Sequence, residues 1–244
     1  MQMVRAEVWK IPAHIKEPKA KVELDSDING ACISLTPLQL HSIIQSRTGQ
    51  EILQKAHSIL VGGGRIGFEI PEMLKAKTYH TYGMTETYSH IAYRNMDTEW
   101  FSPLPLVSLE KNEDDCLKIK CFLTDDDWLQ SNDIVAFQNL GFKVLGRKDN
   151  VINTGGLKLH PEEIEAEILA ENPHAFNQFF IDSEKDEVLG ERVVLLKKKG
   201  LNLKLNKSSN LKYIKNIVEL EKIVLTETQK IDRLLNMKKA GLMV

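Results

Sequence analysis

Threonines, a glycine and a glutamate gather at residues 81–87, which read T-Y-G-M-T-E-T. They directly follow a run at residues 77–82 that predicts a β-strand, and open α/β sheets bind their ligands at strand carboxyl ends. Threonine hydroxyls can donate to phosphate oxygens, glycine lets the backbone approach a ligand, and one carboxylate with phosphate oxygens suits Mg²⁺. Taken alone, the same residues are also typical of a polar surface turn.

Two later segments also carry charged residues at turns. Residues 146–165 read G-R-K-D-N-V-I-N-T-G-G-L-K-L-H-P-E-E-I-E, which predicts a strand end, a polar hinge, a glycine turn and a proline-started helix. Residues 226–233 read T-E-T-Q-K-I-D-R and present Lys230 in a polar loop. Each segment alone fits a domain connection or a solvated lysine equally well.

The surrounding elements predict an α/β fold in the first part of the chain. Thr36 and Pro37 form a helix start, with a hydroxyl N-cap and proline in the first turn. Strands and helices alternate with glycines at strand ends, which predicts a mostly parallel sheet, followed after Trp100 by short antiparallel strands. The expected strands are 6–11, 31–35, Ser58–Val61, 77–82, 115–123 and 133–138, and the expected helices follow Thr36 and cover 71–76.

A second, smaller α+β unit follows the polar hinge, so we expect two domains, at 1–148 and 149–244. The expected helices of the second unit are 161–170 and 209–220, the latter capped by Ser208 or Ser209, and its expected strands are 177–182, 192–197 and 223–225.

Composition narrows the class of protein. The chain has 244 residues, 42% hydrophobic and 27% charged, which excludes a mostly disordered or collagen-like chain. Its apolar runs are far shorter than the roughly 20 residues that span a bilayer, and no signal peptide is visible, so we expect a cytoplasmic protein without a membrane partner. The three cysteines, Cys32, Cys116 and Cys121, fit reduced thiols with no metal site.

Charge is divided unevenly along the chain. From Lys197 onward there are 12 basic and 4 acidic residues, a net charge of +8, whereas the preceding residues sum to −10. A basic segment can bind nucleic acid. Because Tyr213 is the segment's one aromatic residue, a base-stacking platform is disfavoured, and we expect no nucleic acid partner. The alternative is a small basic domain that closes over an anionic small molecule.

Taken together and in order, the three segments resemble motifs of the ANL superfamily of adenylate-forming enzymes. Residues 82–86 are similar to its Y-G-x-T-E motif, residues 146–165 to its G-R-x-D…G…P-x-E-I-E segment, and residues 229–233 to its terminal G-K-x-x-R. Gln229 replaces the usual glycine of the last motif, and Asn132 replaces the glycine of the T-G-D motif before Asp133. Segments around residues 33–40, 81–92 and 149–156 most resemble the o-succinylbenzoate–CoA ligases of menaquinone biosynthesis.

The resemblance implies an ATP-dependent acid–CoA ligase that works through an acyl-adenylate, with ATP, Mg²⁺ and CoA as cofactor and co-substrates. It implies that Tyr82 packs on adenine, beside Gly83, and that Thr85 binds the α-phosphate. Glu86 would bind Mg²⁺ and Lys230 would bridge the α-phosphate and the substrate carboxylate.

It implies further roles for the remaining motif residues. Asp133 would accept the ribose hydroxyls, and Arg147 would contact ribose or phosphate. The resemblance implies that residues 1–148 are the C-terminal portion of the large AMP-binding domain and that residues 149–244 are its small lid, with Asp149 as the hinge. The glycine turn of Gly62, Gly63 and Gly64 would border the adenine or the acid, and the glycine pair of Gly155 and Gly156 would line the path of CoA. His90 and His160 are interpreted as packing residues.

Family members also carry a Ser/Thr/Gly-rich phosphate loop, and this chain shows none, so we expect it to start inside the large domain. Three hypotheses remain open. The chain is a minimal or truncated ligase, acting alone, as a homodimer or with a missing N-terminal portion; or it is a non-catalytic nucleotide- or CoA-binding remnant; or, least favoured, a nucleic-acid-binding domain. Within the ligase hypothesis, a fatty or other aryl acid is the alternative substrate.

Overall fold

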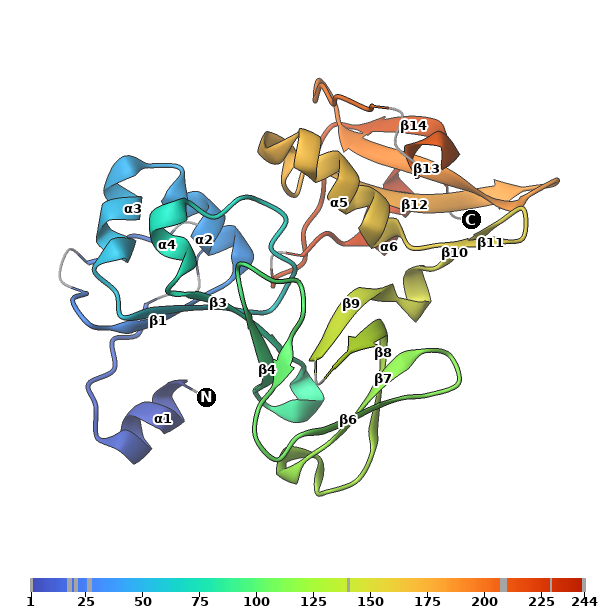
Figure 1. Ribbon diagram of the computed structural model, residues 1–244. Coiled ribbons are helices and arrows are strands. Elements are labelled where there is room, and N and C mark those ends of the chain that lie inside the picture. Colours follow the sequence, from blue (N-terminus) through green and yellow to red (C-terminus); the bar gives the residue numbers. More distant parts are fainter. Residues whose placement is uncertain are drawn as a thin grey trace.

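The protein is described from a computed structural model of the chain. The structure describes residues 2–244 apart from 17, 18, 20, 21, 26, 27, 140, 207–209, 229, 243 and 244, and for residues 2, 3 and 5 it describes the backbone alone. The predicted caps Ser208 and Ser209, and Gln229, therefore lie outside the described residues. Three sheets build the molecule, two in the first part of the chain and one in the last (Figure 1).

The first sheet has the order β1-β2-β3-β4-β5, with β1, β2 and β3 parallel and the last two strands antiparallel. Three helices lie on one face of its parallel strands (Figure 1). The strands are β1 (Cys32–Leu35), β2 (Ser58–Val61), β3 (Thr78–Gly83), β4 (His90–Asn95) and β5 (Ser102–Pro103). The helices are α2 (Pro37–Ile44), α3 (Arg47–Gln54) and α4 (Glu72–Lys75).

The helix start predicted at Thr36 is confirmed as a complete capping box. The Thr36 hydroxyl accepts the Gln39 amide and the Gln39 side chain accepts the Thr36 amide, so two otherwise unpaired donors of α2 are satisfied. Leu40, Ile43 and Ile44 of this helix are buried in the core over the parallel strands. This core fixes the strand ends at which the first motif lies.

The second sheet is antiparallel, with the order β6-β7-β8-β9, as the sequence after Trp100 predicted. Its strands are β6 (Ser108–Lys111), β7 (Cys116–Lys120), β8 (Leu129–Gln138) and β9 (Gly141–Arg147). Phe142 is fully buried and stacks on Phe101, at 5.5 Å between ring centroids, which joins this sheet to the strand region of the first. Cys116 and Cys121 are buried here, whereas Cys32 is exposed on β1.

The third sheet begins at β10 and forms the α+β unit that the sequence predicted. Its order is β11-β10-β13-β12, and β14 pairs with β13. One long helix and one short helix accompany it (Figure 1). The elements are β10 (Ile152–Thr154), β11 (Leu157–Leu159), α5 (Pro161–Glu171), β12 (Phe179–Asp186), β13 (Gly190–Lys198), β14 (Ile214–Leu220) and α6 (Arg233–Lys239). The predicted boundary between residues 148 and 149 falls just before this sheet, and the two-domain division stays a prediction.

Three expected elements are wrong. Residues 209–220 were expected as a helix, but Leu211–Tyr213 form one 3-10 turn and Ile214–Leu220 form the strand β14, parallel to β13. The apolar spacing fits a helix, but the backbone donors and acceptors of β13 offer a partner that favours extended structure. Residues 223–225 form no strand beyond one bridge between Leu225 and Ile231.

Residues 6–11 were expected as a strand, but Gln2–Trp9 form the helix α1. Ala6 is buried, whereas Val4, Val8 and Trp9 are more than half exposed. Figure 1 shows α1 beyond β1, on the side away from α2–α4. Short apolar runs do not distinguish strand from helix by periodicity, and no neighbouring strand pairs with this segment among the described residues. No described helix is long and apolar enough to cross a membrane.

Candidate functional site

A cavity of about 320 Å³ brings the first and last motifs together. Gly83 and Thr85 line it from the end of β3 and the 3-10 turn that follows, Gly63 lines it from the turn after β2, and Lys230 lines it from the third unit. These residues are separated by up to 167 positions in the chain, yet they surround one hollow. The structure thus places a cationic side chain and a threonine turn side by side.

The glycine turn owes its composition to close contacts. A Cβ on Gly62 would lie 2.5 Å from the Thr81 hydroxyl, which itself donates to the carbonyl of Val61. Gly63 has φ +83°, a backbone conformation that favours glycine. A Cβ on Gly64, by contrast, would make ordinary contact with Pro37, 3.6 Å away. The first two glycines are therefore required by the turn, and the third is not.

A buried histidine holds this turn in place. The Arg94 guanidinium donates to His80 Nδ1 at 3.2 Å, so the other ring nitrogen, Nε2, carries the proton and donates to the Gly64 carbonyl at 2.9 Å. His80 is 7% exposed, and its burial, reinforced by Arg94, lowers its pKa to about 4. A neutral imidazole thus links β3 to the glycine turn. Sequence reasoning missed His80, whose position inside the β3 run gave no signal.

Gly83 itself is required by the next strand. A Cβ there would lie 2.3 Å from the Ser89 carbonyl oxygen and 2.6 Å from His90 Cα. The chain passes this close because β3 and β4 pair with a register shift between Tyr82 and Gly83. Ser89 and His90 consequently line the cavity, together with Thr81 and Met84. His90, interpreted from the sequence as a packing residue, is thus a lining residue.

Glu86 is exposed on the 3-10 turn Thr85–Thr87, beside Thr85 but outside the cavity lining. No group of three or more His, Cys, Asp or Glu residues is placed to hold a metal in the part of the chain that the structure describes. A magnesium ion needs no such group when phosphate oxygens supply most ligands, and a single accessible carboxylate beside Thr85 fits that donor set.

The residues predicted to hold the ribose form a second cluster, adjacent in sequence to the cavity through Tyr82. The Tyr82 hydroxyl donates to Asp133 Oδ2 at 2.5 Å, and Arg147 Nη1 lies 3.5 Å from Asp133 Oδ1. Burial, and then the neighbouring carboxylate of Asp133, raise the pKa of the Tyr82 phenol. The Tyr82 ring packs edge-on against Phe142, at 5.1 Å between centroids.

Sheet register sets the geometry of this cluster. Asp133 in β8 and Arg147 in β9 are directly opposed across the antiparallel pair. Arg147 also bonds Asp149, at 2.7 Å, and Asn132 donates to both oxygens of Asp149 at 3.2 Å. The hydrogen bond that Arg147 donates to Asp149 holds the pKa of Arg147 above its usual value. The predicted hinge residue is therefore tied to the second sheet on both sides.

Gly155 and Gly156, predicted to line the CoA path, lie outside the cavity. They form the left-handed turn between β10 and β11, with φ +55° and +80°. The Gly155 amide donates to the Leu189 carbonyl at 3.0 Å. Their predicted role stays a prediction.

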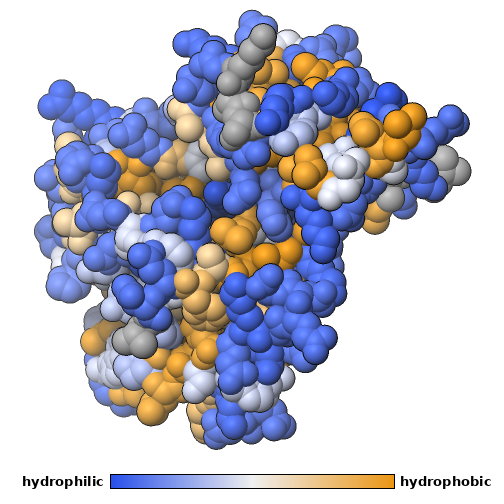
Figure 2. All heavy atoms as spheres, turned by 45° about the vertical axis from the view of Figure 1, so that its right-hand side comes forward, coloured by the Kyte–Doolittle hydropathy of each residue, from blue (hydrophilic) through white to orange (hydrophobic). Residues whose placement is uncertain are grey.

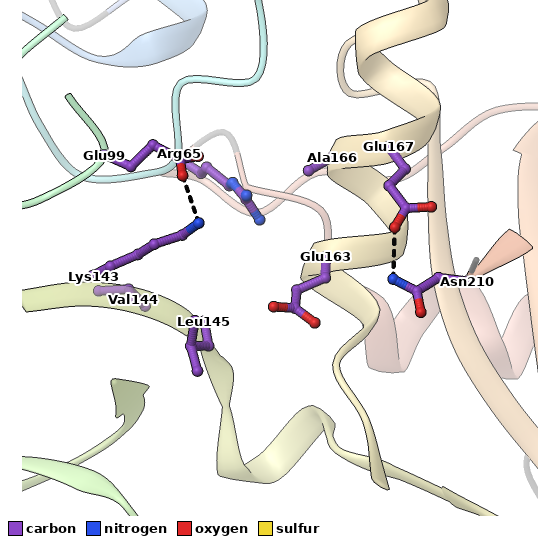
Figure 3. A pocket seen from close by; sticks show the side chains of 9 residues that line it. All are labelled: Arg65, Glu99, Lys143, Val144, Leu145, Glu163, Ala166, Glu167 and Asn210. Carbon is purple, nitrogen blue, oxygen red and sulfur yellow. Dashed lines mark hydrogen bonds and ion pairs between the residues drawn. The ribbon is translucent and has the colours of Figure 1, made fainter. Parts of the chain in front are cut away.

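A second hollow, of about 230 Å³, separates α5 from β9 (Figure 3). Its charged side chains largely satisfy one another, since Lys143 bonds Glu99 at 2.5 Å and Asn210 donates to Glu167 at 2.6 Å. Arg65 on the opposite wall donates to the backbone carbonyl of Glu162 at 2.6 Å. This hollow is better described as a polar seam between the two parts than as a ligand site.

Aromatic rings complete the seam. Phe176, next to α5, packs against Phe68 and His41 of the first part, with centroid distances of 5.0 and 5.1 Å. Burial lowers the pKa of His41. Figure 2 shows hydrophilic side chains over much of one face of the molecule, with hydrophobic ones gathered near its centre. Helix α5 and the segment that follows it therefore form one contact between the third unit and the first part of the chain, and Lys230 at the cavity forms another.

Comparisons with known proteins agree with this architecture, although no family model matches the chain. A 2-succinylbenzoate–CoA ligase of Haemophilus influenzae is 30% identical over 184 residues, covering 67% of this chain and 40% of that protein. The Escherichia coli enzyme of the same name is 27% identical over 180 residues, covering 66% of this chain and 39% of that protein. The chain thus spans about 40% of the length of the curated relatives that it matches.

Among solved structures, ATP-bound MatB from Rhodopseudomonas palustris superposes with a TM-score of 0.69, over 85% of this chain and 50% of that one. At 17% identity this likeness concerns the fold alone. It confirms the expected fold class, a parallel sheet with helices, an antiparallel sheet and a small α+β unit. By sequence the chain resembles the 2-succinylbenzoate–CoA ligases, and it has the fold of the matched half of MatB.

Proposed function

We propose that this chain provides the adenylate-binding and lid part of an ATP-dependent acid–CoA ligase that acts through an acyl-adenylate. The observation that carries the proposal is the shared cavity of Gly63, Gly83, Thr85 and Lys230. Three turns distant in sequence converge there, in the order and with the residue types of the family motifs. The carboxylate substrate is proposed to be o-succinylbenzoate, because both curated relatives carry that activity in their names.

The residues divide the work by position. Asp133, held by Tyr82 and Arg147, keeps lone pairs free for two ribose hydroxyls. Thr85 donates to the α-phosphate, and the ammonium of Lys230 neutralises charge that develops between that phosphate and the attacking carboxylate. Glu86 would hold Mg²⁺, which supplies charge neutralisation on the nucleotide phosphates. The lid carries Asp149 as its pivot and presents Gly155 and Gly156 to CoA in the second half-reaction.

Calorimetric titration with a non-hydrolysable o-succinylbenzoyl-adenylate analogue tests this function on the chain as it is. We expect saturable binding that Thr85→Ala weakens about tenfold or more, since a hydrogen bond to a charged group contributes about 1.5–3 kcal/mol. Thr48→Ala is the matched control, because Thr48 is exposed on α3, away from the cavity. Absence of analogue binding would refute the proposal.

Pyrophosphate exchange then separates a ligase from a non-catalytic remnant. Exchange driven by o-succinylbenzoate supports catalysis by this chain, and exchange driven instead by benzoate or a fatty acid would reassign the acid. Analogue binding without any pyrophosphate exchange favours the second candidate, a non-catalytic nucleotide-binding module. This candidate is considered because the chain spans only 39–40% of the length of its curated relatives.

A further inference from the structure

The loop that carries Lys230 is a tight hairpin with its own hydrogen bonds. The Thr226 amide donates to the Lys230 carbonyl at 2.7 Å, and the Lys230 amide donates back to the Thr226 hydroxyl at 3.1 Å. The Asp232 amide donates to the Val224 carbonyl at 3.0 Å, which closes the base. These bonds shape the hairpin, but they do not fix its place on the body of the protein.

Two polar side chains of α6 provide that attachment. Asn236 is fully buried and bonds both the amide and the carbonyl of Val224, at 2.9 and 2.8 Å. Asn236 therefore holds the hairpin to α6. Arg233, three residues beyond Lys230, reaches in the opposite direction, away from the hairpin and into the third sheet.

Arg233 joins three elements at once. One guanidinium nitrogen donates to Glu165 of α5 at 2.6 Å, and another donates to the carbonyl of Ile181 in β12. The guanidinium also lies over the buried ring of Phe180, 5.5 Å from its centroid, and 3.8 Å from Asp182. The Glu165 and Arg233 side chains are only 20% and 22% exposed. A planar fork of donors suits this divided contact, whereas a lysine has a single donor head.

Glu165 is itself fixed on its other side. The same oxygen that accepts from Arg233 accepts the Ile181 amide at 2.8 Å, so the carboxylate links α5 to β12. Burial raises the pKa of Glu165, against the pull of the neighbouring Arg233. Because α5 also contacts Arg65, and Phe176 packs on Phe68, the position of α5 is set by the first part of the chain, which supplies the cavity's other lining residues.

We propose that Arg233, through its pairing with Glu165, is a positioning residue that holds the Lys230 hairpin in register with α5 and so at the cavity. The pair transmits the docking of α5 on the first part of the chain to the ammonium at the hairpin tip. The consequence for catalysis rests on the proposed function of Lys230, whereas the consequence for hairpin order does not.

Hydrogen exchange on the full chain tests whether the pair keeps the hairpin ordered. In Arg233→Met we expect exchange at the Thr226 and Lys230 amides to quicken at least tenfold, with the β14 amides unchanged. Arg192→Met is the matched control, because Arg192 pairs with Glu184 on the same sheet, at 2.8 Å, without touching the hairpin. Unchanged exchange at both hairpin amides in Arg233→Met would overturn the proposal.

Two milder variants test whether the effect of Arg233→Met is due to unfolding of the protein or to loss of charge alone. Glu165→Gln keeps an acceptor for the Ile181 amide and should loosen the hairpin while the protein stays folded. Arg233→Lys keeps the charge and three donors on one nitrogen, but it lacks the two separate nitrogens with which Arg233 reaches Glu165 and the Ile181 carbonyl, so it should not restore hairpin protection. Restoration by lysine would show that charge alone suffices and would contradict the geometric role.

A chemical readout separates this inference from the proposed function. Pyridoxal phosphate labels accessible lysines. In the wild-type chain, ATP with Mg²⁺ should protect Lys230 from this labelling. In Arg233→Met, that protection should be at least tenfold weaker. A wild-type Lys230 that ATP does not protect counts against the proposed function alone, provided that the exchange result holds. Retained protection in Arg233→Met, despite a loosened hairpin, would overturn the link between the pair and the cavity.

Discussion

The hydroxyl of Tyr82 and the carboxylate of Asp133 meet at 2.5 Å and join the carboxyl end of a strand in the first sheet to a central strand of the second. The two residues lie 51 positions apart, on β3 and β8. One oxygen of Asp133 is thereby committed to the protein, while Arg147 approaches the other only at 3.5 Å. The carboxylate is oriented before any ligand arrives.

Tyr82→Phe should therefore destabilise the protein and misorient Asp133. Removing a part-buried bond to a charged acceptor costs about 1.5–3 kcal/mol, and this loss should appear in urea denaturation at pH 7. Tyr93→Phe is the control, since Tyr93 is 39% exposed on the neighbouring strand. Equal stabilities for the two variants would show that the Tyr82–Asp133 bond contributes nothing.

His80 should make stability depend on pH. Its pKa is lowered from 6.5 to about 4 in the folded protein, so the unfolded chain takes up the proton first as pH falls. The stability is fully present above pH 6.5 and is lost between pH 6.5 and 4, by about 2 kcal/mol from pH 7 to pH 5. His80→Gln should remove that part of the pH dependence, whereas His57→Gln, at an exposed position, should not. Denaturant titrations at both pH values measure it, and parallel curves for wild type and His80→Gln would contradict the assignment.

Gly83→Ala should be far more damaging than Gly64→Ala. The new methyl at residue 83 meets backbone atoms at 2.3 and 2.6 Å, which cannot rotate away, whereas at residue 64 it meets Pro37 at an ordinary 3.6 Å. Overpacking of this kind costs about 1–3 kcal/mol or more. Thermal unfolding of the two variants side by side gives the comparison, and a Gly83→Ala protein as stable as Gly64→Ala would refute the close approach.

Lys230→Ala should reduce adenylation by about 10²–10³-fold, since an oriented electrostatic contact contributes roughly 3–4 kcal/mol to a transition state. It should spare thioester formation from a preformed adenylate, because under the proposed function the lid would present a different face in that step. Lys222→Ala, an exposed lysine of the same basic segment, is the control. If the chain alone shows no pyrophosphate exchange, the affinity of Lys230→Ala for the adenylate analogue is measured by calorimetry in place of the adenylation rate. Equal loss in both half-reactions would contradict the role of Lys230.

The sequence predicted those elements whose signals are local. Ser58–Val61 is an apolar run that ends at three glycines and forms β2 with those limits, and the cap at Thr36 is completed within three residues, by Gln39. The prediction of a helix at β14 was wrong because the apolar residues of this segment fit both the helical and the strand period. Only pairing with the parallel strand β13 decides between the two. A pairing strand that lies elsewhere in the chain cannot be recognised from the sequence of the segment itself.

The candidate site was predicted in part for the same reason. The motif residues Gly83, Thr85 and Lys230 were named from the sequence, and the structure brings them to one cavity. His80 could not be found, because its importance lies in two bonds, to Arg94 and to the Gly64 carbonyl, that only the folded chain creates.

The direct opposition of Asp133 and Arg147 across β8 and β9 has a consequence for how this chain can change over evolutionary time. Alternate residues of a strand face opposite sides, and the β8–β9 pair already contains one register shift, between Ile134 and Val135. One further residue inserted into or deleted from the paired strands would therefore turn Arg147 away from the carboxylate. Val135 and Phe142 of this hairpin are buried in the core, so substitutions are tolerated mainly at its exposed positions. Descendants of this chain that bind a ribose at Asp133 should therefore vary at those exposed positions while conserving the number of residues in the hairpin.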